Sequence, residues 1–398
     1  MKTKIINISK IYTWNPDSSS VDIFKNHEIL IENNEILSIN KSINENCNII
    51  DAENCVLTPG FIDSHTHPIF IGNRANEFNM RLNGKSYDDI KKMGGGILSS
   101  IKSLRNSSFD ELYEYSIKNI KPFINFGTTT MEAKSGYGLS VKDEIKSLKV
   151  IQKINEELCL DIIPTFLGAH DIPEEYGLNE YVDLICEEMI PQIAEQKLAV
   201  FCDVFCEEGY FNIKHSKRIL ETSKKYNLKP RIHADEFNYF GASELAANIG
   251  ALSADHLMVI NDKGINALAK SKTVATILPG TTFFLNKDKY ANARKLIDRG
   301  CTVALASDFN PGTSTIRSLS NIMFLAMHKC GLTLEESFLG VTYNAAKSLQ
   351  KEDSLGLIRK RYKADFIFWD INNLEEIPYW FDSSNTKILK VVKNGKLL

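Results

Sequence analysis

The sequence predicts an α/β fold, a (β/α)8 TIM-like barrel with a small β-sandwich domain built from the two chain termini. Between residues 58 and 349, eight short apolar runs alternate with longer amphipathic segments of helical period. Both ends of the chain instead carry β-branched residues between turns rich in Asn, Asp and Ser. A chain of 398 residues has room for two or three average domains, or for one large barrel with an addition.

The two terminal segments, residues 1–57 and 350–398, are expected to fold together as one composite β domain. Helix signals are poor in both, and neither is large enough to bury a hydrophobic core alone. The strands expected near the N-terminus are Ile5–Tyr12, His27–Glu32 and Glu35–Ile39. Those expected near the C-terminus are Ala364–Trp369 and Ile388–Val392, before a turn at Asn394-Gly395.

Residues 58–349 are assigned to the barrel. The eight strands expected there are Phe61–His65, Thr128–Lys134, Ile162–His170, Val200–Cys206, Arg231–Ala234, Ala254–Leu257, Thr273–Leu278 and Thr302–Ser307. The segments of helical period between them include Ser86–Leu104, Asp110–Phe126, Lys142–Leu158, Asn179–Gln196 and Lys214–Tyr226. The run Gly94-Gly95-Gly96 is not followed by the Lys-Ser/Thr of a phosphate-binding loop, so it indicates a flexible lid or a turn.

The composition excludes several classes of function. The chain has 47 basic and 50 acidic residues, a net charge of −3, which gives no general attraction to nucleic acid or to an anionic membrane. No apolar run approaches the roughly 20 residues that span a bilayer, and the first residues lack the features of a secretion signal. Eight cysteines in a chain of this length form no dense disulfide pattern. We therefore expect a cytoplasmic protein whose partner is a small-molecule substrate.

The segment Pro59–His67 ends in His-x-His, which places two imidazoles on the same side of a strand. Alone, the pair better fits two hydrogen-bonded surface histidines. His233 closes a second strand and Asp308 follows a third; each by itself fits a buried structural histidine or a helix N-cap. Their common position at strand ends favours metal ligands. Three imidazoles and one carboxylate suit zinc or ferrous iron better than magnesium or calcium.

Three further residues are candidates for roles beside the metal: proton transfer, polarisation of a substrate and contact with the substrate. Glu236 follows His233 by three residues and can take a proton from water activated at the metal, although Asp235 competes for this role or caps the next helix. His256 can polarise a carbonyl or stabilise an oxyanion; the alternative is a hydrogen-bonded core histidine. His170 fits a substrate contact or a metal ligand, and the four ligands already assigned favour the substrate.

Two segments are candidates for binding substrate. Arg74, a few residues after His67, is placed to bind an anionic group by paired hydrogen bonds, although a single arginine is by default structural. The segment Lys134-Ser135-Gly136-Tyr137-Gly138 bends at its glycines and can present the Tyr137 hydroxyl to a substrate. Lys134 fits a salt bridge to an internal acid, and no catalytic role is assigned to it.

These motifs resemble those of the amidohydrolase superfamily, which shares Pro-Gly-x-x-Asp-x-His-x-His, a later His-x-x-Glu, a lone His and a late Asp. Within it, the chain resembles the imidazolonepropionase family. The stretches that carry this resemblance are Phe70–Phe78, Gly94–Ile97, Glu132–Leu139, Thr165–His170, Asp203–Glu207, His233–Phe237, Ser253–Leu257 and Asp308–Gly312. Near the C-terminus, Lys360-Arg361-Tyr362-Lys363 replaces the family's glycine-rich turn, which puts only the local turn geometry in doubt.

The resemblance implies one divalent metal, zinc or iron, held by His65, His67, His233 and Asp308. It implies catalytic roles for Glu236, His256 and Asp308, and substrate contacts from Arg74, Tyr87, Tyr137, His170, Glu236, Asn310, Gly312 and Thr313. The activity implied is hydrolysis of the lactam C–N bond of 4-imidazolone-5-propanoate to N-formimidoyl-L-glutamate, in histidine degradation. A homodimer is expected.

Two other functions stay open from the sequence. A related amidohydrolase that deaminates a cyclic amidine or a nucleobase would use the same metal ligands. The anion anchor, Arg74 with Tyr137 and His170, argues against a neutral nucleobase. A non-catalytic barrel is the second alternative, and the complete set of metal ligands argues against it.

Overall fold

The computed structural model describes residues 2–85 and 87–398. Its centre is an eight-stranded parallel sheet in which each strand pairs with the next one along the chain. The strands are β8 (Phe61–Asp63), β9 (Thr128–Lys134), β10 (Asp161–Ala169), β11 (Phe201–Cys206), β12 (Lys229–Ala234), β13 (Ser253–His256), β14 (Val274–Ile277) and β15 (Val303–Leu305). The predicted barrel is confirmed, with strand ends within two residues of the expected ones.

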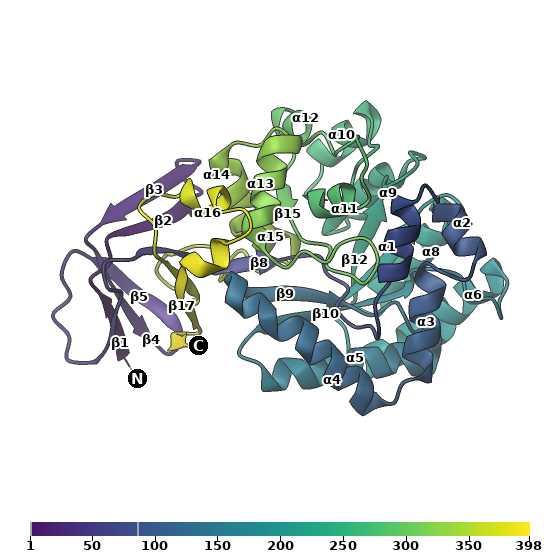
Figure 1. Ribbon diagram of the computed structural model, residues 1–398, viewed down its shortest axis with the longest axis horizontal. Coiled ribbons are helices and arrows are strands. Elements are labelled where there is room, and N and C mark those ends of the chain that lie inside the picture. The colour runs from purple at the N-terminus through teal and green to yellow at the C-terminus, as the bar shows by residue number, and fades with distance from the viewer. Residues whose placement is uncertain (1, 86) are drawn as a thin grey trace.

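Helices connect the barrel strands and cover the outside of the sheet (Figure 1). They are α1 (Ala75–Leu82), α2 (Tyr87–Lys92), α3 (Ile97–Asn106), α4 (Phe109–Ile120), α5 (Val141–Glu157), α6 (Leu178–Leu184), α7 (Ile190–Glu195), α8 (Ile213–Lys225), α9 (Ala242–Ile249), α10 (Asp262–Ala269), α11 (Pro279–Phe284), α12 (Ala293–Asp298), α13 (Leu319–Lys329), α14 (Leu334–Gly340) and α15 (Tyr343–Ser348). A short α16 (Glu376–Tyr379) follows later in the chain.

Three of the predicted helices are interrupted. The segment Ser86–Leu104 forms α2 and α3, separated at Gly94 and Gly96, whose φ angles of 79° and 75° do not fit a right-handed helix. The segment Asn179–Gln196 contains a π-helical turn before α7, next to Pro191, which lacks the amide hydrogen that continues a helix. After α4, the chain tightens into a 3-10 helix, Lys121–Phe126.

The first and last barrel strands meet along a seam at the carboxyl end of the sheet. β8 and β15 are the two ends of the strand order. The residues that follow these strands bridge the seam: the amide of Asp308 donates to the carbonyl of His65 at 3.0 Å, and the amide of His67 donates to that of Phe309 at 2.8 Å. The barrel is therefore joined at the two segments in which the sequence places the candidate metal ligands.

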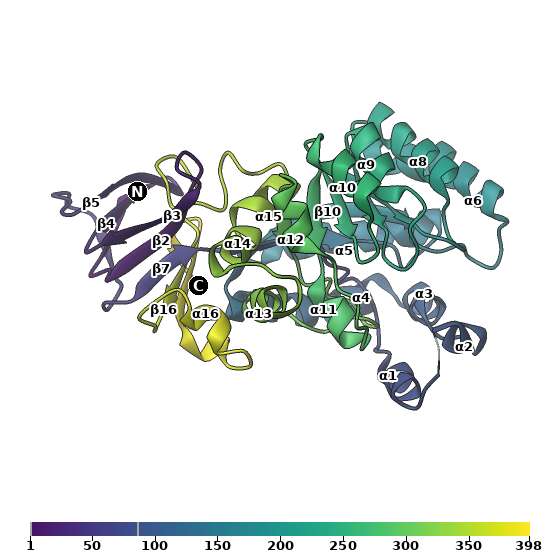
Figure 2. The same cartoon turned by 90° about the horizontal axis from the view of Figure 1, so that it is seen from above.

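The chain termini form two further sheets beside the barrel. One has the order β5-β4-β1-β6 and the other the order β18-β17-β16-β7-β2-β3. Their strands are β1 (Lys2–Ile6), β2 (Lys10–Asn15), β3 (Ser20–Lys25), β4 (Glu28–Glu32), β5 (Glu35–Asn40), β6 (Asn48–Asp51), β7 (Val56–Pro59), β16 (Phe366–Trp369), β17 (Ile388–Lys393) and β18 (Lys396–Leu397). Figures 1 and 2 show the purple N-terminal strands beside the yellow C-terminal ones.

A shared core joins the two ends of the chain. β7 pairs with β16 in antiparallel fashion, and Ile29 and Leu57 lie in one hydrophobic cluster with Phe366 and Val392. The single strand predicted over Ile5–Tyr12 is wrong. The chain turns at Asn7, which has a φ of 55°, so that β1 and β2 enter different sheets.

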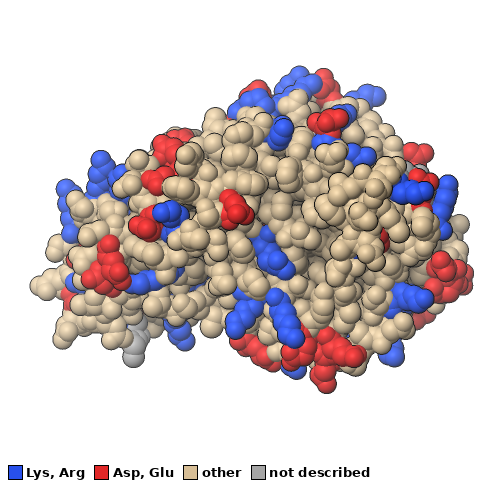
Figure 3. Space-filling view, in the orientation of Figure 1, with Lys and Arg blue, Asp and Glu red and all other residues tan. Residues whose placement is uncertain are grey.

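The outer surface carries charges of both signs, spread over the face that Figure 3 shows. In the part of the chain that the structure describes, no helix is both long enough and apolar enough to cross a membrane.

Asp161 links the start of a barrel strand to the C-terminal strands. Its carboxylate accepts hydrogen bonds from Lys393 at 2.8 Å and from Lys363 at 3.0 Å, and Lys393 also donates to Asp365 at 2.7 Å. Burial raises the pKa of the Asp161 carboxyl, but the charges of Lys393 and Lys363 outweigh it and lower this pKa below its ordinary value. The ionised carboxylate therefore stabilises the fold.

We expect Asp161→Asn to lower the free energy of unfolding at neutral pH by about 2 kcal/mol, because a charge-assisted hydrogen bond is lost. A lowered folded-state pKa gives stability that is complete above the unfolded-state pKa and disappears as the pH falls through the folded-state pKa. The difference between wild type and variant should therefore shrink below about pH 4. Urea unfolding across this pH range measures it, with Asp382→Asn, at an exposed carboxylate, as the control.

Candidate active site

The structure brings most of the predicted site residues to one cavity at the carboxyl end of the barrel. The predicted residues that line it are His67, Arg74, Tyr137, His170, His233, Glu236, His256, Asp308, Asn310 and Thr313. His65 is fully buried next to them, and Gly312 lies against the Arg74 side chain. Tyr87 begins α2, and its side chain lies outside the part that the structure describes.

Strand direction explains this convergence. His233 lies in β12 and His256 ends β13, while His67 follows β8 and Asp308 follows β15. Because the strands are parallel, these positions share one end of the barrel. Alternation along β12 also places Arg231 and His233 on the same side of the strand, with Arg231 one layer deeper in the barrel.

Four ligand atoms meet at distances that fit a metal ion. The Nε2 atom of His67 lies 3.2 Å from that of His65, 3.3 Å from that of His233 and 3.4 Å from Oδ1 of Asp308. The distance from His65 Nε2 to Asp308 Oδ1 is 3.5 Å. Two ligands of one ion at 2.0–2.1 Å lie about 3.3–3.4 Å apart at a tetrahedral angle. The ligand atoms of His65, His67 and His233 lie within 4.8 Å of one another, and so do those of His65, His256 and Asp308. The donor set therefore fits one divalent cation.

Two carboxylates fix the tautomers of the candidate ligands. His65 Nδ1 donates to Asp255 at 2.7 Å, and His233 Nδ1 donates to Asp203 at 3.1 Å. Because a carboxylate only accepts, the hydrogen is on Nδ1 in both rings, and each Nε2 is the atom that a metal ion can bind. Burial lowers the pKa of His67 to about 4, which keeps that ring neutral. Burial and the charge of Lys134 lower the pKa of His65, but Asp255 and Asp308 outweigh them and raise it to about 9, so a metal ion must displace a proton from this ring. Carboxylate–histidine pairs of this kind orient metal-binding imidazoles.

A buried ionic network supports these two carboxylates. Lys134 Nζ lies 2.6 Å from Glu132 and 2.8 Å from Asp203, and Arg231 Nη2 lies 3.3 Å from Asp255. All five side chains are fully buried. Burial lowers the pKa of the Lys134 amine, but the charges of Asp203 and Glu132 outweigh it and raise this pKa above its ordinary value. Lys134 therefore stays charged, as the sequence predicted for a lysine paired with internal acids.

Glu236 and His256 face one another across the cavity. Glu236 Oε2 lies 3.6 Å from His256 Nε2, and both side chains are more than nine-tenths buried. Burial, with the charges of Asp308 and Glu207, raises the pKa of the Glu236 carboxyl well above its ordinary value. Burial lowers the pKa of His256 well below its ordinary value, so the imidazole is neutral. The pair combines a carboxyl that can hold a proton with an uncharged imidazole.

Arg74 supplies the cation of the site. Among the described residues, its Nε and Nη1 atoms are buried without a hydrogen-bond partner, although Glu77 lies 3.8 Å from Nε. A Cβ on Gly312 would lie 1.3 Å from Arg74 Nη2, so only a glycine leaves room for the guanidinium. Buried donors without partners beside a cavity are suited to bind an anion.

Asn310 organises the loop beside Arg74. Its side-chain oxygen accepts from the amides of Gly312 and Thr313, at 2.8 and 2.7 Å. Its side-chain nitrogen donates to the Asp308 carbonyl at 2.7 Å and to the Thr313 hydroxyl at 2.8 Å. These bonds use the full capacity of the amide, so Asn310 holds the loop that carries Gly312.

The sequence left several supporting residues without a role. Asp203 and Asp255 belong to motifs in the sequence that assign them no role, and no pattern in the sequence connects Glu132 to the site. The signal that could have found them is a charged residue inside an otherwise apolar barrel strand, because such a residue needs a partner in the barrel interior. Glu77 had no such signal, since it lies on a short and mostly polar helix.

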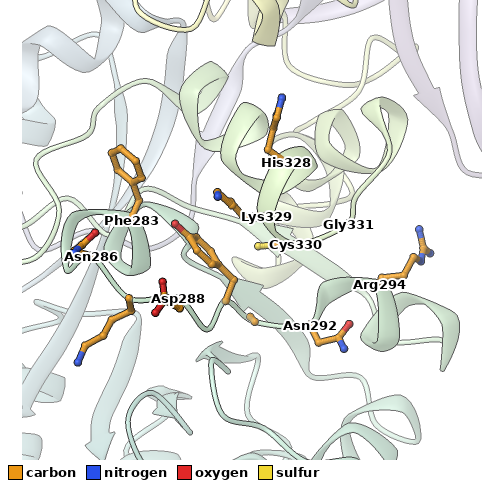
Figure 4. A pocket seen from close by; sticks show the side chains of 12 residues that line it. Phe283, Asn286, Asp288, Asn292, Arg294, His328, Lys329, Cys330 and Gly331 are labelled. Carbon is orange, nitrogen blue, oxygen red and sulfur yellow. The ribbon is translucent and has the colours of Figure 1, made fainter.

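Two other hollows lie near the site but outside it. One of about 470 Å3 shares Phe237 with the cavity and is lined by α1 and α11 side chains such as Phe78 and Phe284. The other, of about 630 Å3, lies between the end of α11 and α13, where Figure 4 shows Phe283, Arg294 and His328 around it. None of the predicted site residues lines either hollow.

The chain is similar to known proteins along most of its length. The model of the amidohydrolase family matches residues 56–398. Imidazolonepropionase of Thermoanaerobacter pseudethanolicus is 44% identical, over 98% of this chain and 97% of its own. Imidazolonepropionase of Clostridium tetani is 42% identical, over 96% and 93%.

Solved structures support the fold. Guanine deaminase from C. acetobutylicum superposes with a TM-score of 0.75 over 100% of both chains, at 16% identity. Triazine hydrolase from Arthobacter aurescens gives 0.77 over 100% of this chain and 94% of its own, also at 16% identity. The likeness to these two enzymes concerns the fold alone, whereas the sequence relatives match along almost the whole chain. The chain belongs to the amidohydrolase family and, within it, to the imidazolonepropionases.

Proposed function

We propose that this chain hydrolyses the lactam C–N bond of 4-imidazolone-5-propanoate to give N-formimidoyl-L-glutamate. The observation that carries the proposal is the position of Arg74, which lines the same cavity as His67, His233 and Asp308 and whose buried Nε and Nη1 atoms form no hydrogen bond within the described part of the chain. A metal site beside an anion anchor is suited to a small substrate with a carboxylate and a cleavable amide bond.

One divalent ion, zinc or iron, is proposed at His65, His67, His233 and Asp308. When bound, such an ion acts as a Lewis acid and lowers the pKa of water toward neutrality. The buried histidines suit both metals, and the carboxylates of Asp203 and Asp255 hold two of the imidazoles in the required tautomer.

Proton transfer is assigned to Glu236. Its carboxylate takes a proton from the attacking water, holds it because its pKa is raised, and returns it to the ring nitrogen as the C–N bond breaks. His256 faces the same point and donates a hydrogen bond to the carbonyl oxygen as negative charge develops there. Asp308 orients the attacking water together with Glu236.

Substrate binding is assigned to the other side of the cavity. Arg74 and the backbone at Gly312 and Thr313 hold the propanoate, while His170 and Tyr137 orient the ring. The rings of His170 and His67 are stacked, with centroids 5.1 Å apart, so a substrate ring held by His170 lies next to the metal ligands.

Turnover of imidazolonepropanoate by protein of measured metal content tests the proposal. We expect hydrolysis that rises in proportion to bound zinc or iron and stops after chelation. Release of ammonia from a nucleobase or cyclic amidine, without turnover of imidazolonepropanoate, would show that the chain is a deaminase. Folded protein that stays inactive after zinc or iron is added would show a non-catalytic barrel.

Gly312→Ala should weaken substrate binding without harming the fold. The added Cβ displaces the Arg74 guanidinium, so the propanoate loses its paired hydrogen bonds. We expect KM to rise on the order of 10- to 100-fold, with kcat little changed, and Arg74→Ala to do the same. Gly177→Ala is the control, since a Cβ there meets no atom within 4 Å. A fall in kcat at constant KM would contradict the assignment.

We also propose residues 1–57 and 350–398 as one composite domain and residues 58–349 as the barrel domain; the hydrophobic cluster built from both chain ends supports this division. The homodimer, the cytoplasmic location and the absence of nucleic-acid binding stay predictions of the sequence.

A further inference from the structure

The loop Ser135–Leu139 carries Tyr137 into the cavity and is held by two charged side chains that the sequence did not single out. These are Glu144, in the first turn of α5, and Arg105, near the end of α3. Neither side chain lines the cavity. Both bind the backbone of the loop, and Glu144 also contacts the Ser135 side chain, so they act on the shape of the loop.

Glu144 binds the amides of the loop. Its Oε1 accepts from Gly138 at 2.8 Å and from Leu139 at 2.9 Å, and both carboxylate oxygens lie within 3.2 Å of the Gly136 amide. The side chain is fully buried. Burial raises the pKa of this carboxyl, while the hydrogen bonds from Ser135 and from the three amides lower it. The three amide donors favour the ionised form, and their charge-assisted bonds to it fix the loop.

Arg105 binds the backbone carbonyls of the same loop. Its Nε donates to the Gly138 carbonyl at 2.7 Å and its Nη2 donates to that of Leu139 at 2.9 Å. Gly138 and Leu139 are thus held by an anion at their amides and by a cation at their carbonyls. The loop needs such support because Leu139 has a φ of 49°, which costs a residue other than glycine free energy, whereas the φ of 110° at Gly136 is one that glycine adopts readily.

The loop in turn orients His170. The Gly136 carbonyl accepts a hydrogen bond from His170 Nδ1 at 2.8 Å. A carbonyl only accepts, so the hydrogen is on Nδ1 and Nε2 presents a lone pair. A Cβ on Gly136 would lie 3.1 Å from His170 Nδ1 and 2.9 Å from the Leu167 carbonyl, which shows how closely the loop packs on this ring. The Tyr137 ring lies 5.2 Å from that of His170.

We propose that Glu144 and Arg105 are positioning residues that set both the direction of Tyr137 and the tautomer of His170. This inference rests on the proposed function, which assigns substrate binding to Tyr137 and His170. It adds that the site recognises a ring N–H of the substrate, because His170 Nε2 can only accept.

Glu144→Gln is the main test. The variant keeps the size of the side chain but turns one acceptor into an NH2 group that faces backbone donors. We expect KM for imidazolonepropanoate to rise at least tenfold, kcat to stay within about threefold and metal content to stay at the wild-type level. Glu156→Gln, at an exposed site on the same helix, is the control. In a Tyr137→Phe, His170→Gln background, Glu144→Gln should add little to KM.

Arg105→Gln provides a second variant if the first does not fold, and Arg105→Lys should recover part of the lost affinity. An unchanged KM in either folded variant, or a loss confined to kcat or metal content, overturns the inference. The 15N signals of the His170 ring give a readout without substrate: Nδ1 should be protonated in wild type, and the variants should shift toward the other tautomer. If wild type shows this tautomer yet does not turn over imidazolonepropanoate, the proposed function fails while the positioning role stands.

Discussion

Glu236→Gln is expected to lower kcat by a factor on the order of 10²–10⁴, with KM nearly unchanged. Glutamine keeps the size of the side chain, so the cavity retains its shape, but the amide neither takes a proton from water nor returns it to the ring nitrogen. Metal content should stay at the wild-type level, because the four proposed ligands are untouched. Steady-state kinetics on protein of measured metal content records the change.

Two matched variants sharpen this test. Glu208→Gln removes an exposed carboxylate near the mouth of the barrel and should leave kcat unchanged. Asp235→Asn removes the competing carboxylate; burial raises the pKa of Asp235 to about 6, but the residue does not line the cavity, so only a small loss is expected. A larger loss in Asp235→Asn than in Glu236→Gln would transfer the role of base to Asp235.

Lys134→Met is expected to give the largest loss of stability, about 3–5 kcal/mol in the free energy of unfolding. The substitution leaves Glu132 and Asp203 buried without the cation that pairs with both. Asp203 then no longer holds His233 firmly, so metal affinity should also fall, by about 10- to 100-fold. Urea unfolding of the metal-free protein and a metal titration separate the two effects.

Lys225→Met, at an exposed position on α8, is the control for the loss of a lysine. It should change neither the free energy of unfolding nor the metal affinity. If Lys134→Met were as stable as wild type and bound metal with equal affinity, the ionic network would have no role in holding the site.

The barrel could be predicted from the sequence because its strands are buried on both faces. Such strands are short apolar runs that stand out between amphipathic helices. The errors lie where a single residue changes the direction of the backbone. Asn7 breaks the predicted strand Ile5–Tyr12, and the glycines at 94 and 96 divide a predicted helix. Which sheet a terminal strand joins depends on tertiary partners, and these leave no local signal.

For the candidate site, the sequence located the residues that face the cavity, because they follow strand ends. It did not locate the residues that hold them. Asp203 reaches His233 between the neighbouring strands β11 and β12, whereas Asp255 on β13 reaches His65 across the barrel interior, since β13 and β8 are not neighbours in the sheet. Glu144 looks like an ordinary acid in the first turn of a helix, a position where acids are common. Its contacts to a distant loop appear only in the fold.

The proposed metal ion would also have a structural role at the seam between β8 and β15. His65 and His67 come from the first edge of the sheet and Asp308 from the last, so an ion bound to all three is bonded to both edges. It would fasten the barrel at the place where the strand ladder ends. Any movement that opens the seam would then pull the ligands apart. Binding of the ion and closure of the barrel would therefore be coupled.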